Sequence, residues 1–468
     1  MIDIKFGTDG WRAIIDKEFT VDNVERISIA FANWLVNKYD NKNLSVVLGH
    51  DCRRNGELYA ETCAKVLCSQ GIRVLLGKGF VSTPMISLGI KQLHANAGIV
   101  ITASHNPADY NGFKVKADFG GPALPEDITA IEKLIPESSK LKLKSIESYQ
   151  KSELLEYPDL ESMYVHHLEK NFDLNAIRNK LFFAYDAMYG AGQNVIRRLF
   201  PEDQLLHCEL DTSFDGTPPE PLHKNLLELS RTVANDEGLD VGFATDGDAD
   251  RIGMYDRNGN FVDSHHIILL LIHYYARYRK QKGKVVVSFT VSEKVKKLCA
   301  HYDLPIEVTQ VGFKHITEFM INENVLIGGE ESGGIAMIGH IPERDGIWTG
   351  LMLLEFMAKT GKTLNMLVEE IYHIVGEFAY ERNDLHLTEE QKLSIIEKCN
   401  KNKFKSFGKY EVQKVETIDG FKFFFKDEAT VMLRASGTEP VLRVYCEART
   451  VQRVTDLLDA TKKTILEE

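Results

Sequence analysis

A serine between an apolar stretch and an Asn-Pro pair is the first candidate for chemistry in this sequence. Ser104 lies within residues 102–107, which directly follow the apolar run 97–101. This placement predicts a rigid, exposed loop after a strand, where a hydroxyl can act as a nucleophile or carry a phosphate. The same residues also make a good structural turn, so both interpretations stay open from the loop alone.

A second polar loop carries carboxylates at alternate positions, Asp246, Asp248 and Asp250, directly after an apolar stretch. Clustered carboxylates repel one another unless a cation lies among them, and all-oxygen ligation suits Mg²⁺. We therefore predict a magnesium site, with a turn permitted by Gly247 bringing the carboxylates together. An EF-hand calcium loop does not fit, because its twelfth position would be Arg257 instead of Glu. An acidic surface turn is the remaining alternative.

A loop near the C-terminus has the composition of a phosphate cradle. Arg434 can hold a phosphate with two parallel N–H groups, and Gly437 lets backbone N–H groups approach the anion. Ser436 and Thr438 add hydroxyls, and Arg443 follows on the next expected strand. A simple hairpin turn with an exposed arginine is the alternative.

The sequences of two further glycine-containing loops indicate a function less specifically. Residues 329–334 are too acidic for a phosphate loop, but Glu330 and Ser332 offer groups that suit the vicinal hydroxyls of a sugar. Residues 6–12 form a glycine-punctuated turn that ends in Arg12. This turn is either structural or leans over the serine.

Strands and helices alternate ahead of these loops, as in α/β domains. The alternation runs through residues 45–101 and repeats in residues 181–245 and 265–328. It predicts sheets with helices on both faces and places the loops at the carboxyl ends of strands, where open α/β sheets bind ligands. Residues 136–158 read as a connection between domains. Toward the C-terminus, strand-like runs and a final helix over 451–466 indicate a smaller α+β domain.

Length, composition and charge narrow the class of protein. The chain has 468 residues, of which 44% are hydrophobic and 26% charged, as in globular proteins with three or four domains. A net charge of −12 without a long basic cluster argues against a nucleic-acid partner. No apolar run approaches the roughly 18 residues of a membrane span, and seven scattered cysteines fit a reducing compartment. We expect a cytoplasmic protein without a membrane partner.

The order of the four main loops resembles that of the α-D-phosphohexomutase superfamily across essentially the whole chain. The motifs that carry this resemblance are the serine loop at 102–107, Asp-Gly-Asp-Ala-Asp-Arg at 246–251, Gly-Glu-Glu-Ser-Gly at 329–333 and Arg-Ala-Ser-Gly-Thr-Glu-Pro at 434–440. The resemblance implies a heart-shaped, four-domain α/β enzyme around a central cleft, with three related α/β domains that have mixed sheets and a smaller α+β C-terminal domain. We expect domain I at 1–150, domain II at 151–255, domain III at 256–372 and domain IV at 373–468.

The resemblance also implies roles for the residues that match family motifs. The implied positions are Ser104 as phosphoserine with Lys114, Arg251 and Arg12 for catalysis; Ser104, Asp246, Asp248 and Asp250 for one Mg²⁺; Glu330 and Ser332 for the sugar; and Arg434, Ser436, Gly437, Thr438 and Arg443 for the distal phosphate. Lys114 would assist proton transfer, and Arg251 and Arg12 would lie near the transferred group.

Sugar specificity is the point at which the chain departs from part of the family. Phosphomannomutase/phosphoglucomutase enzymes and phosphoglucosamine mutases commonly carry a histidine where this chain has Gly334. His340 and Lys314 instead resemble phosphoglucomutases, in which a histidine at about this place is near the catalytic centre. The resemblance implies a catalytic acid/base role for His340 and a substrate-binding role for Lys314. Trp11 also leans away from phosphoglucosamine mutases.

These matches favour a phosphoglucomutase that interconverts glucose 1-phosphate and glucose 6-phosphate. The implied route passes through a phosphoserine enzyme, with glucose 1,6-bisphosphate as intermediate and activator, and mannose phosphates are possible second substrates. Alternatives are a phosphomannomutase, a phosphoglucosamine or acetylglucosamine-phosphate mutase, and a non-catalytic regulatory protein that binds sugar phosphates. A monomer and a homodimer are both compatible with the sequence.

Overall fold

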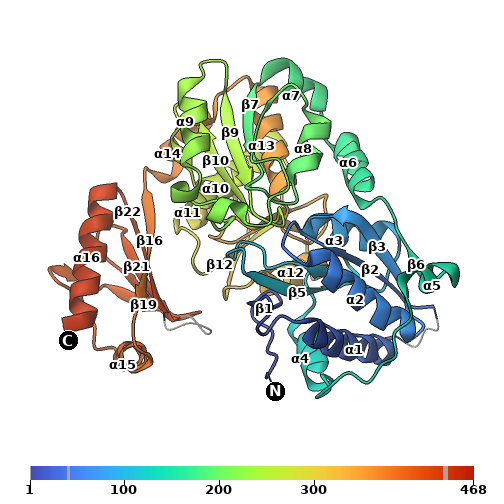
Figure 1. Ribbon diagram of the computed structural model, residues 1–468. Helices are drawn as coiled ribbons and strands as arrows, with labels where there is room; N and C mark the ends of the chain where they lie inside the picture. Colours follow the sequence, from blue (N-terminus) through green and yellow to red (C-terminus); the bar gives the residue numbers. More distant parts are fainter. Residues whose placement is uncertain (1, 40–42, 436–440, 468) are drawn as a thin grey trace.

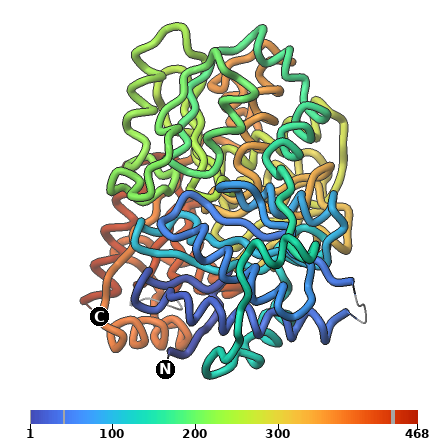
Figure 2. Tube along the Cα trace, turned by 45° about the vertical axis from the view of Figure 1, so that its right-hand side comes forward, coloured from blue at the N-terminus to red at the C-terminus, as the bar shows by residue number. Residues whose placement is uncertain are grey.

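The computed structural model of the protein describes residues 2–39, 43–435 and 441–467. Three α/β domains, I to III, lie together, and the smaller domain IV projects to one side (Figure 1). Figures 1 and 2 both place the yellow segments of domain III between the green domain II and the blue domain I. The four-domain α/β architecture expected from the sequence is confirmed.

Domain I contains a mixed sheet with the strand order β1-β5-β4-β2-β3-β6. The strands are β1 (Trp11–Ile14), β2 (Ser45–His50), β3 (Arg73–Phe80), β4 (Ala97–Ile101), β5 (Tyr110–Ala117) and β6 (Leu155–Glu156). Helices α1 (Val21–Lys38) and α2 (Gly56–Ser69) share a core with Val46 and Leu48, whereas α3 (Thr83–Gln92) shares the opposite core with Val47. Alternate residues of β2 thus face opposite cores, which explains why Val46, Val47 and Leu48 are all apolar.

The predicted connection at residues 136–158 contains a short helix and a short strand that pack on domain I. Helix α5 (Ile146–Lys151) packs near α2, and β6 pairs in parallel with β3 at the edge of the first sheet. A two-residue strand leaves almost no periodic pattern in the sequence, so its pairing depends on the unpaired edge that β3 offers.

Domains II and III each repeat this plan. Domain II has the strand order β11-β10-β9-β7-β8 and domain III the order β13-β12-β14-β15. Their strands are β7 (Phe183–Asp186), β8 (Gln204–Leu206), β9 (Val241–Thr245), β10 (Ile252–Asp256) and β11 (Phe261–Val262), then β12 (Lys284–Ser288), β13 (Ile306–Thr309), β14 (Val325–Gly329) and β15 (Ile335–Met337). Principal helices are α6 (Leu160–Asn171), α7 (Leu174–Lys180), α8 (Gln193–Leu199), α9 (Leu227–Asn235), α10 (Ser264–His273), α11 (Lys294–Tyr302), α12 (Phe313–Asn322), α13 (Gly346–Thr360) and α14 (Leu364–Val375).

The serine, metal and sugar loops occupy equivalent places in these three sheets. Each follows a strand with a parallel neighbour and leads into an antiparallel strand: β4 to β5, β9 to β10, and β14 to β15. The strands expected before these loops are therefore confirmed. This shared position brings all three loops to the carboxyl ends of their strands.

One hydrophobic core runs through domains I, II and III. It joins Val47 on β2, Phe243 on β9 and Ile268 on α10. Helix α13 follows the sugar loop in sequence, yet it packs against β9 and β10 of domain II. The chemistry-bearing loops of these domains are therefore mounted on a continuous packed body.

Domain IV has a core of its own and an antiparallel sheet with the order β16-β22-β21-β20-β19. Its elements are β16 (Ala379–His386), α15 (Glu389–Asn400), β17 (Ser406–Phe407), β18 (Tyr410–Glu411), β19 (Lys414–Glu416), β20 (Phe421–Phe424), β21 (Thr430–Ala435), β22 (Val441–Ala448) and α16 (Val451–Glu467). Phe289 of domain III packs with Met432 and Tyr445 in a small cluster between the two domains. Domain IV is thus joined to the rest mainly through polar contacts and this small apolar cluster.

All seven cysteines lie within the described ranges and are buried free thiols. None of the helices in these ranges combines the length and the apolar character needed to cross a bilayer.

The joint between α13 and domain II can be tested at Gly350. A Cβ atom at this position would lie 2.7 Å from Cε2 of Phe243, so we expect Gly350→Val to overpack the joint and lower the free energy of unfolding by about 1–3 kcal/mol. Met366→Val, on the exposed side of α14, is the control for placing a β-branched residue in a helix. Equal thermal unfolding midpoints for the two variants would contradict the tight packing.

Candidate active site

Loops from the first three domains touch one another at a single centre. The Ser104 hydroxyl donates to Asp246 Oδ2 at 2.8 Å, joining domain I to domain II. The backbone N–H of Thr83, at the start of α3, donates to the carbonyl of Asp248 at 3.0 Å. On the other side, Arg251 and Gly334 form a backbone bridge between the metal and sugar loops. The structure therefore brings together loops that are far apart in the sequence.

Ser104 is fully buried, so the predicted exposed position is wrong. The metal loop covers the serine: a Cβ atom at Gly247 would lie 2.5 Å from the Ser104 carbonyl oxygen. Ser104 also has a φ of 53°, in the left-handed region that a non-glycine residue seldom occupies. Such backbone strain persists only where surrounding contacts enforce it, and it is common at functional sites.

One buried guanidinium enforces the conformation of the serine loop. Arg53 donates to the carbonyl oxygens of Ser104 at 2.7 Å, Asn106 at 2.5 Å, Pro107 at 2.7 Å and Tyr110 at 3.1 Å. Its planar, rigid fork of N–H groups suits several fixed acceptors at once. The sequence analysis missed Arg53 because these acceptors are backbone atoms that no side-chain pattern reports.

Asp51 completes the support beneath the serine. Its Oδ2 lies 3.3 Å from Arg53 Nε and accepts from the Thr102 hydroxyl at 2.5 Å. The Ser104 backbone N–H in turn donates to the Thr102 hydroxyl oxygen at 2.9 Å. Ser104 is therefore connected through Thr102 and Asp51 to the same guanidinium that holds its carbonyl group.

The metal loop turns differently from the expectation. Ala249, with a φ of 58°, adopts the left-handed conformation, while Gly247 serves the close approach to Ser104. Asp246 Oδ1 accepts from the backbone N–H groups of Asp250 at 2.9 Å and Arg251 at 3.0 Å. The first carboxylate of the loop thereby stabilises its own turn.

The three aspartates fit a divalent cation. One ligand oxygen from each of Asp246, Asp248 and Asp250 lies within 4.8 Å of the others, and all three side chains are buried. Asp248 Oδ1 and Asp250 Oδ1 accept no hydrogen bond from the described residues, which is costly for buried carboxylate oxygens. Burial and then the neighbouring Asp250 and Asp248 carboxylates raise the pKa of Asp246 well above its ordinary value. A cation among them would remove that repulsion.

Lys114 on β5 supplies positive charge to this cluster. Its buried amine lies 2.7 Å from Asp248 Oδ2, 3.2 Å from Asp250 Oδ2 and 2.8 Å from Asp9 Oδ2. Burial alone would lower the pKa of the Lys114 amine, but Asp248, Asp250 and Asp9 raise it. Lys114 is therefore a protonated cation in this arrangement.

Arg344 is a second buried cation, which the sequence analysis did not select. Its Nη2 lies 2.7 Å from Asp250 Oδ2 and also contacts Asp9 Oδ2. A Cβ atom at Gly334 would lie 2.4 Å from Arg344 Cδ, so the arginine side chain fills the space beside the sugar loop. Glu343 Oε1 lies 3.6 Å from Arg344 Nε, and Glu343 Oε2 lies 2.6 Å from Lys116 Nζ. A larger side chain at position 334 would therefore collide with Arg344.

His340 belongs to an aromatic and carboxylate cluster at the start of α13. Its Nε2 lies 2.9 Å from Asp345 Oδ2, and its ring stacks on Trp348 with 3.8 Å between centroids. His167 Nε2 approaches His340 Nδ1 at 3.2 Å. None of these described contacts is with Ser104 or with the three aspartates of the metal loop, so an acid/base role for His340 stays a prediction.

Arg12 contacts the serine loop, and His105 belongs to it. Arg12 Nη1 donates to Asn106 Oδ1 at 2.8 Å, which places the guanidinium at the serine loop. Its predicted position near the transferred group stays a prediction. His105 Nδ1 lies 3.4 Å from the Ser104 hydroxyl oxygen. Burial, followed by Arg251 and Arg12, holds the pKa of His105 well below its ordinary value. The imidazole beside the serine is therefore neutral near pH 7.

The sugar loop contains one buried carboxylate. Glu330 Oε1 accepts from the backbone N–H of Gly312 at 2.9 Å, and burial raises the pKa of Glu330. Ser332 is partly exposed, and Lys314 lies half-buried in the first turn of α12, which begins just after Gly312. The structure thus places all of these predicted residues near one end of the β14 strand, with their ligand roles still predictions.

The phosphate loop is described in part. Ser436, Gly437 and Thr438 lie outside the described residues. Arg434 Nε contacts Asp419 Oδ2 at 3.1 Å, and Arg434 is the register partner of Arg443 across β21 and β22. The two predicted arginines are therefore neighbours on one face of the sheet.

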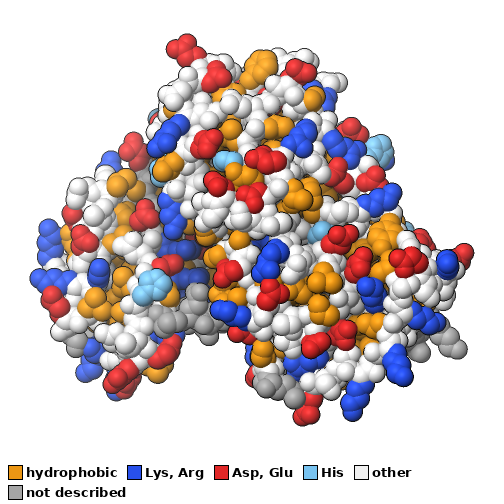
Figure 3. Space-filling view, viewed as in Figure 1, with side chains coloured by type: hydrophobic (Ala, Val, Ile, Leu, Met, Phe, Trp, Pro, Cys, Tyr) orange, Lys and Arg blue, Asp and Glu red, His pale blue; other side chains and the backbone are white. Residues whose placement is uncertain are grey.

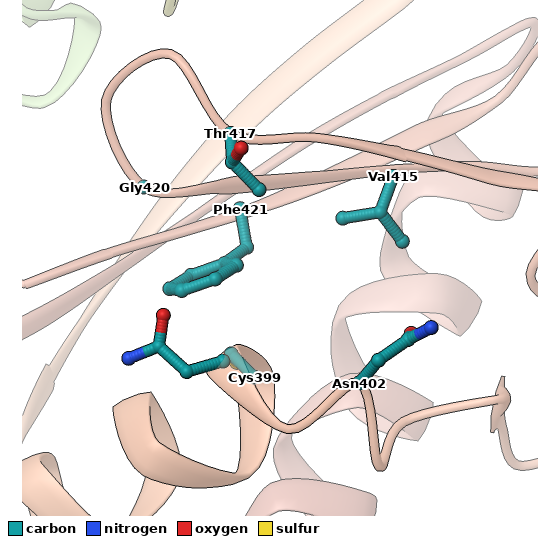
Figure 4. Close-up of a pocket in the computed structure, with 7 residues that line it drawn as sticks. Cys399, Asn402, Val415, Thr417, Gly420 and Phe421 are labelled. Carbon is teal, nitrogen blue, oxygen red and sulfur yellow. The ribbon is translucent and has the colours of Figure 1, made fainter.

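One hollow lies beside domain IV and one cavity lies within it. In Figure 3 the surface is hollowed between domain IV and the rest, and Lys and Arg side chains gather there. A separate cavity of about 480 Å³ inside domain IV lies between α15 and the segment from β19 to β20 (Figure 4). Its lining residues are Cys399, Asn400, Asn402, Val415, Thr417, Gly420 and Phe421. None of the predicted site residues lines this cavity.

Models of four successive protein domains match nearly the whole chain. They are those of phosphoglucomutase/phosphomannomutase: α/β/α domain I at residues 3–142, domain II at 162–259, domain III at 263–375 and the C-terminal domain at 385–464. The chain belongs to the phosphoglucomutase/phosphomannomutase family. It is therefore a phosphohexomutase, an isomerase that transfers phosphate intramolecularly.

Full-length relatives of this family differ in the sugar that their names specify. The chain is 29% identical to a phosphoglucomutase/phosphomannomutase of Thermococcus kodakarensis, over 99% of this chain and 98% of that protein. It is 30% identical to a phosphoglucosamine mutase of Latilactobacillus sakei, with the same coverage. A crystal structure from Thermus thermophilus, provisionally named a phosphomannomutase, superposes with a TM-score of 0.86 at 32% identity and covers 99% of both chains.

The support that Arg53 gives to the serine loop of this phosphohexomutase can be tested by Arg53→Lys. An ammonium keeps the charge but cannot reach the same set of carbonyl oxygens, so we expect turnover to fall at least about tenfold and unfolding free energy by about 1–3 kcal/mol. The neighbouring Arg54→Lys is the control, because the Arg54 side chain is half-exposed and pairs with Asp16. Equal turnover of the two variants would contradict the assignment.

Proposed function

We propose that the protein is a phosphoglucomutase that interconverts glucose 1-phosphate and glucose 6-phosphate, with Ser104 carrying a phosphoryl group between turnovers. The observation that carries the proposal is the bond from the Ser104 hydroxyl to Asp246 within a buried carboxylate cluster. A phosphoserine carries a charge of about −1.5 to −2. A buried site must balance this negative charge with cations. Lys114, Arg344 and the unpaired aspartate oxygens together suit a phosphoserine and a divalent cation.

Asp246, Asp248 and Asp250 would hold Mg²⁺ beside the serine phosphate. When bound, the ion would neutralise charge on the transferring phosphoryl group. The protein's own residues align the reaction: Arg53 holds the serine loop, and Lys114 places a cation against the aspartates. Burial of Ser104 limits the access of water that would hydrolyse its phosphate.

Transfer would occur in two steps through a sugar bisphosphate. An oxygen of the bound hexose phosphate bonds to phosphorus as the bond from phosphorus to Ser104 Oγ breaks. The resulting glucose 1,6-bisphosphate then turns around and returns its other phosphoryl group to Ser104. Lys114 and His340 stay the predicted residues for the accompanying proton transfers, and Arg251 and Arg12 are proposed to lie near the transferred group.

The opposite end of the sugar phosphate would be bound by domains III and IV. Glu330, Ser332 and Lys314 are proposed to contact the sugar. The distal phosphate is assigned to the loop after β21 and its neighbour on β22, namely Arg434, Ser436, Gly437, Thr438 and Arg443. The gathering of Lys and Arg side chains in the hollow beside domain IV supports an anionic ligand there (Figure 3).

Other hexose phosphates fit the family equally well. The name of the Latilactobacillus sakei relative favours an amino sugar phosphate, and that of the Thermococcus kodakarensis relative includes mannose phosphate. Glucose is preferred here because His340 and Lys314 resemble phosphoglucomutases, while Gly334 stands where the other classes commonly carry a histidine. The buried free thiols support action in the reducing cytoplasm.

Ser104→Ala tests the proposed phosphoryl carrier. Alanine removes the acceptor oxygen, so we expect at least about a thousandfold loss of conversion of glucose 1-phosphate to glucose 6-phosphate in a coupled assay. Wild-type specificity constants for glucose, mannose and glucosamine phosphates identify the sugar. Intact-mass measurement after incubation with glucose 1,6-bisphosphate should show one added phosphate on the wild type and none on the variant. A phosphorylated, active Ser104→Ala protein would refute the proposal.

Asp248→Asn tests the metal assignment without relying on turnover. Removing one negative ligand should weaken Mn²⁺ binding, measured by titration calorimetry or electron paramagnetic resonance, by at least about tenfold, or about 1.4 kcal/mol. Asp427→Asn in domain IV is the control, because its carboxylate pairs with Arg453 on the surface. Unchanged Mn²⁺ affinity in Asp248→Asn would place the cation elsewhere.

A further inference from the structure

The sugar loop is held from two opposite sides. On the side of domain II, Arg251 and Gly334 form a backbone bridge, and the Ile252 N–H donates to the Gly333 carbonyl oxygen at 3.2 Å. On the side of domain IV, Arg382 Nη1 donates to Glu331 Oε1 at 3.1 Å. Glu331 directly follows the proposed sugar ligand Glu330, so this contact acts on the loop where the sugar is expected.

Arg382 is oriented by its own strand before it reaches domain III. On β16, Arg382 Nε lies 3.2 Å from Asp384 Oδ1, and Nη2 donates to Asp384 Oδ2 at 3.3 Å. Residues two apart on a strand share one face, so Asp384 holds one edge of the guanidinium and leaves Nη1 for Glu331. Such a pre-oriented arginine loses less side-chain entropy when it forms the interdomain contact.

Neighbouring carboxylates stabilise the charged form of Arg382. Burial would lower the pKa of its guanidinium, but Glu331 and Asp384, with a smaller effect of Glu220, raise it. Glu220 Oε1 also lies 3.5 Å from Arg251 Nη1 at the end of the metal loop. Arg382 is therefore in contact with carboxylates of domains III and IV, and Glu220 of domain II acts on it from a longer distance.

The row of charges continues to the proposed phosphate residues. Asp384 is the register partner of Arg443, and Arg443 is the register partner of Arg434. Cross-strand partners are close neighbours on one face of a sheet. The face of domain IV that carries the phosphate arginines thus also carries the group that contacts the sugar loop.

We propose that Arg382 is a positioning residue that couples the seating of domain IV to the conformation of the sugar loop. The inference rests on the proposed function, because it links the proposed phosphate arginines to the proposed sugar ligands. Domain IV has a separate core and a small apolar contact with domain III, so polar pairs at the boundary decide its seating. When the Arg382–Glu331 pair forms, a ligand held by domain IV meets a sugar loop that is already in its binding conformation.

A purely structural ion pair between domains is the competing explanation, and the chain offers a matched control for it. Lys297 on α11 contacts Glu428 Oε2 of domain IV at 2.6 Å. This pair crosses the same domain boundary, but neither residue is in the sugar loop. If Arg382 merely fastens domain IV, then Lys297→Gln and Arg382→Gln should have similar effects.

The first experiment uses the full-length protein and needs no knowledge of the sugar. Amide hydrogen exchange of residues 329–334 should become at least about threefold faster in Arg382→Gln and in Glu331→Gln than in the wild type, and stay unchanged in Lys297→Gln. Arg382→Lys, which keeps the charge, should give an intermediate rate. Unchanged exchange in Arg382→Gln, or an equal increase in Lys297→Gln, would overturn the proposal.

The second experiment measures kcat and KM for the hexose phosphate that the wild type converts best. Arg382→Gln and Glu331→Gln should each lower kcat/KM on the order of tenfold, mainly through KM, and the double variant should be no worse than either, since both remove one coupling. Additive losses would overturn the coupling. If the wild type converts no hexose phosphate, the proposed function fails, while the exchange experiment still decides the role of Arg382.

Discussion

Charge compensation across domain boundaries is the interaction on which the site depends. The metal loop of domain II contributes buried carboxylates and the N-terminal turn of domain I a mostly buried one, and Lys114 of domain I and Arg344 of domain III contact both. A buried charge that loses its partner costs about 3–5 kcal/mol. Because partners come from different domains, the carboxylates can be buried together only when all three α/β domains are packed. Formation of the site and packing of domains I to III therefore depend on each other.

Two kinds of mechanical support follow from this arrangement. The serine and metal loops are mounted on a core that is continuous through domains I, II and III, and the serine loop is further held by Arg53 in a strained backbone conformation. Domain IV, with a separate core, is joined through polar pairs and a small apolar cluster. Groups that must be aligned for phosphoryl transfer thus lie in the rigid part, and the proposed distal phosphate site lies on the more loosely attached part.

Much of the fold could be predicted because its signals are local. The apolar runs before Ser104, Asp246 and Glu330 are β4, β9 and β14, and the order of the loops identifies the family. Prediction was poorer where an element depends on a distant partner. The short strand β6 needs the edge of β3. Helix α13 is buried along almost its whole length, so its sequence does not indicate which domain it packs against. The exposure of Ser104 was mispredicted because the metal loop that covers it is more than a hundred residues away.

The sequence alone determined the chemistry that is available: a serine after a strand, three alternating carboxylates, and arginines in a glycine-containing loop. These are properties of residue types and spacing, which survive without any tertiary contact. Tertiary structure decided which charges meet. Arg53 binds backbone oxygens, Arg344 fills the space beside Gly334, and Lys114 reaches carboxylates of two domains. These interactions join residues that follow no characteristic spacing in the chain. They could therefore be recognised only from the packed arrangement of the domains.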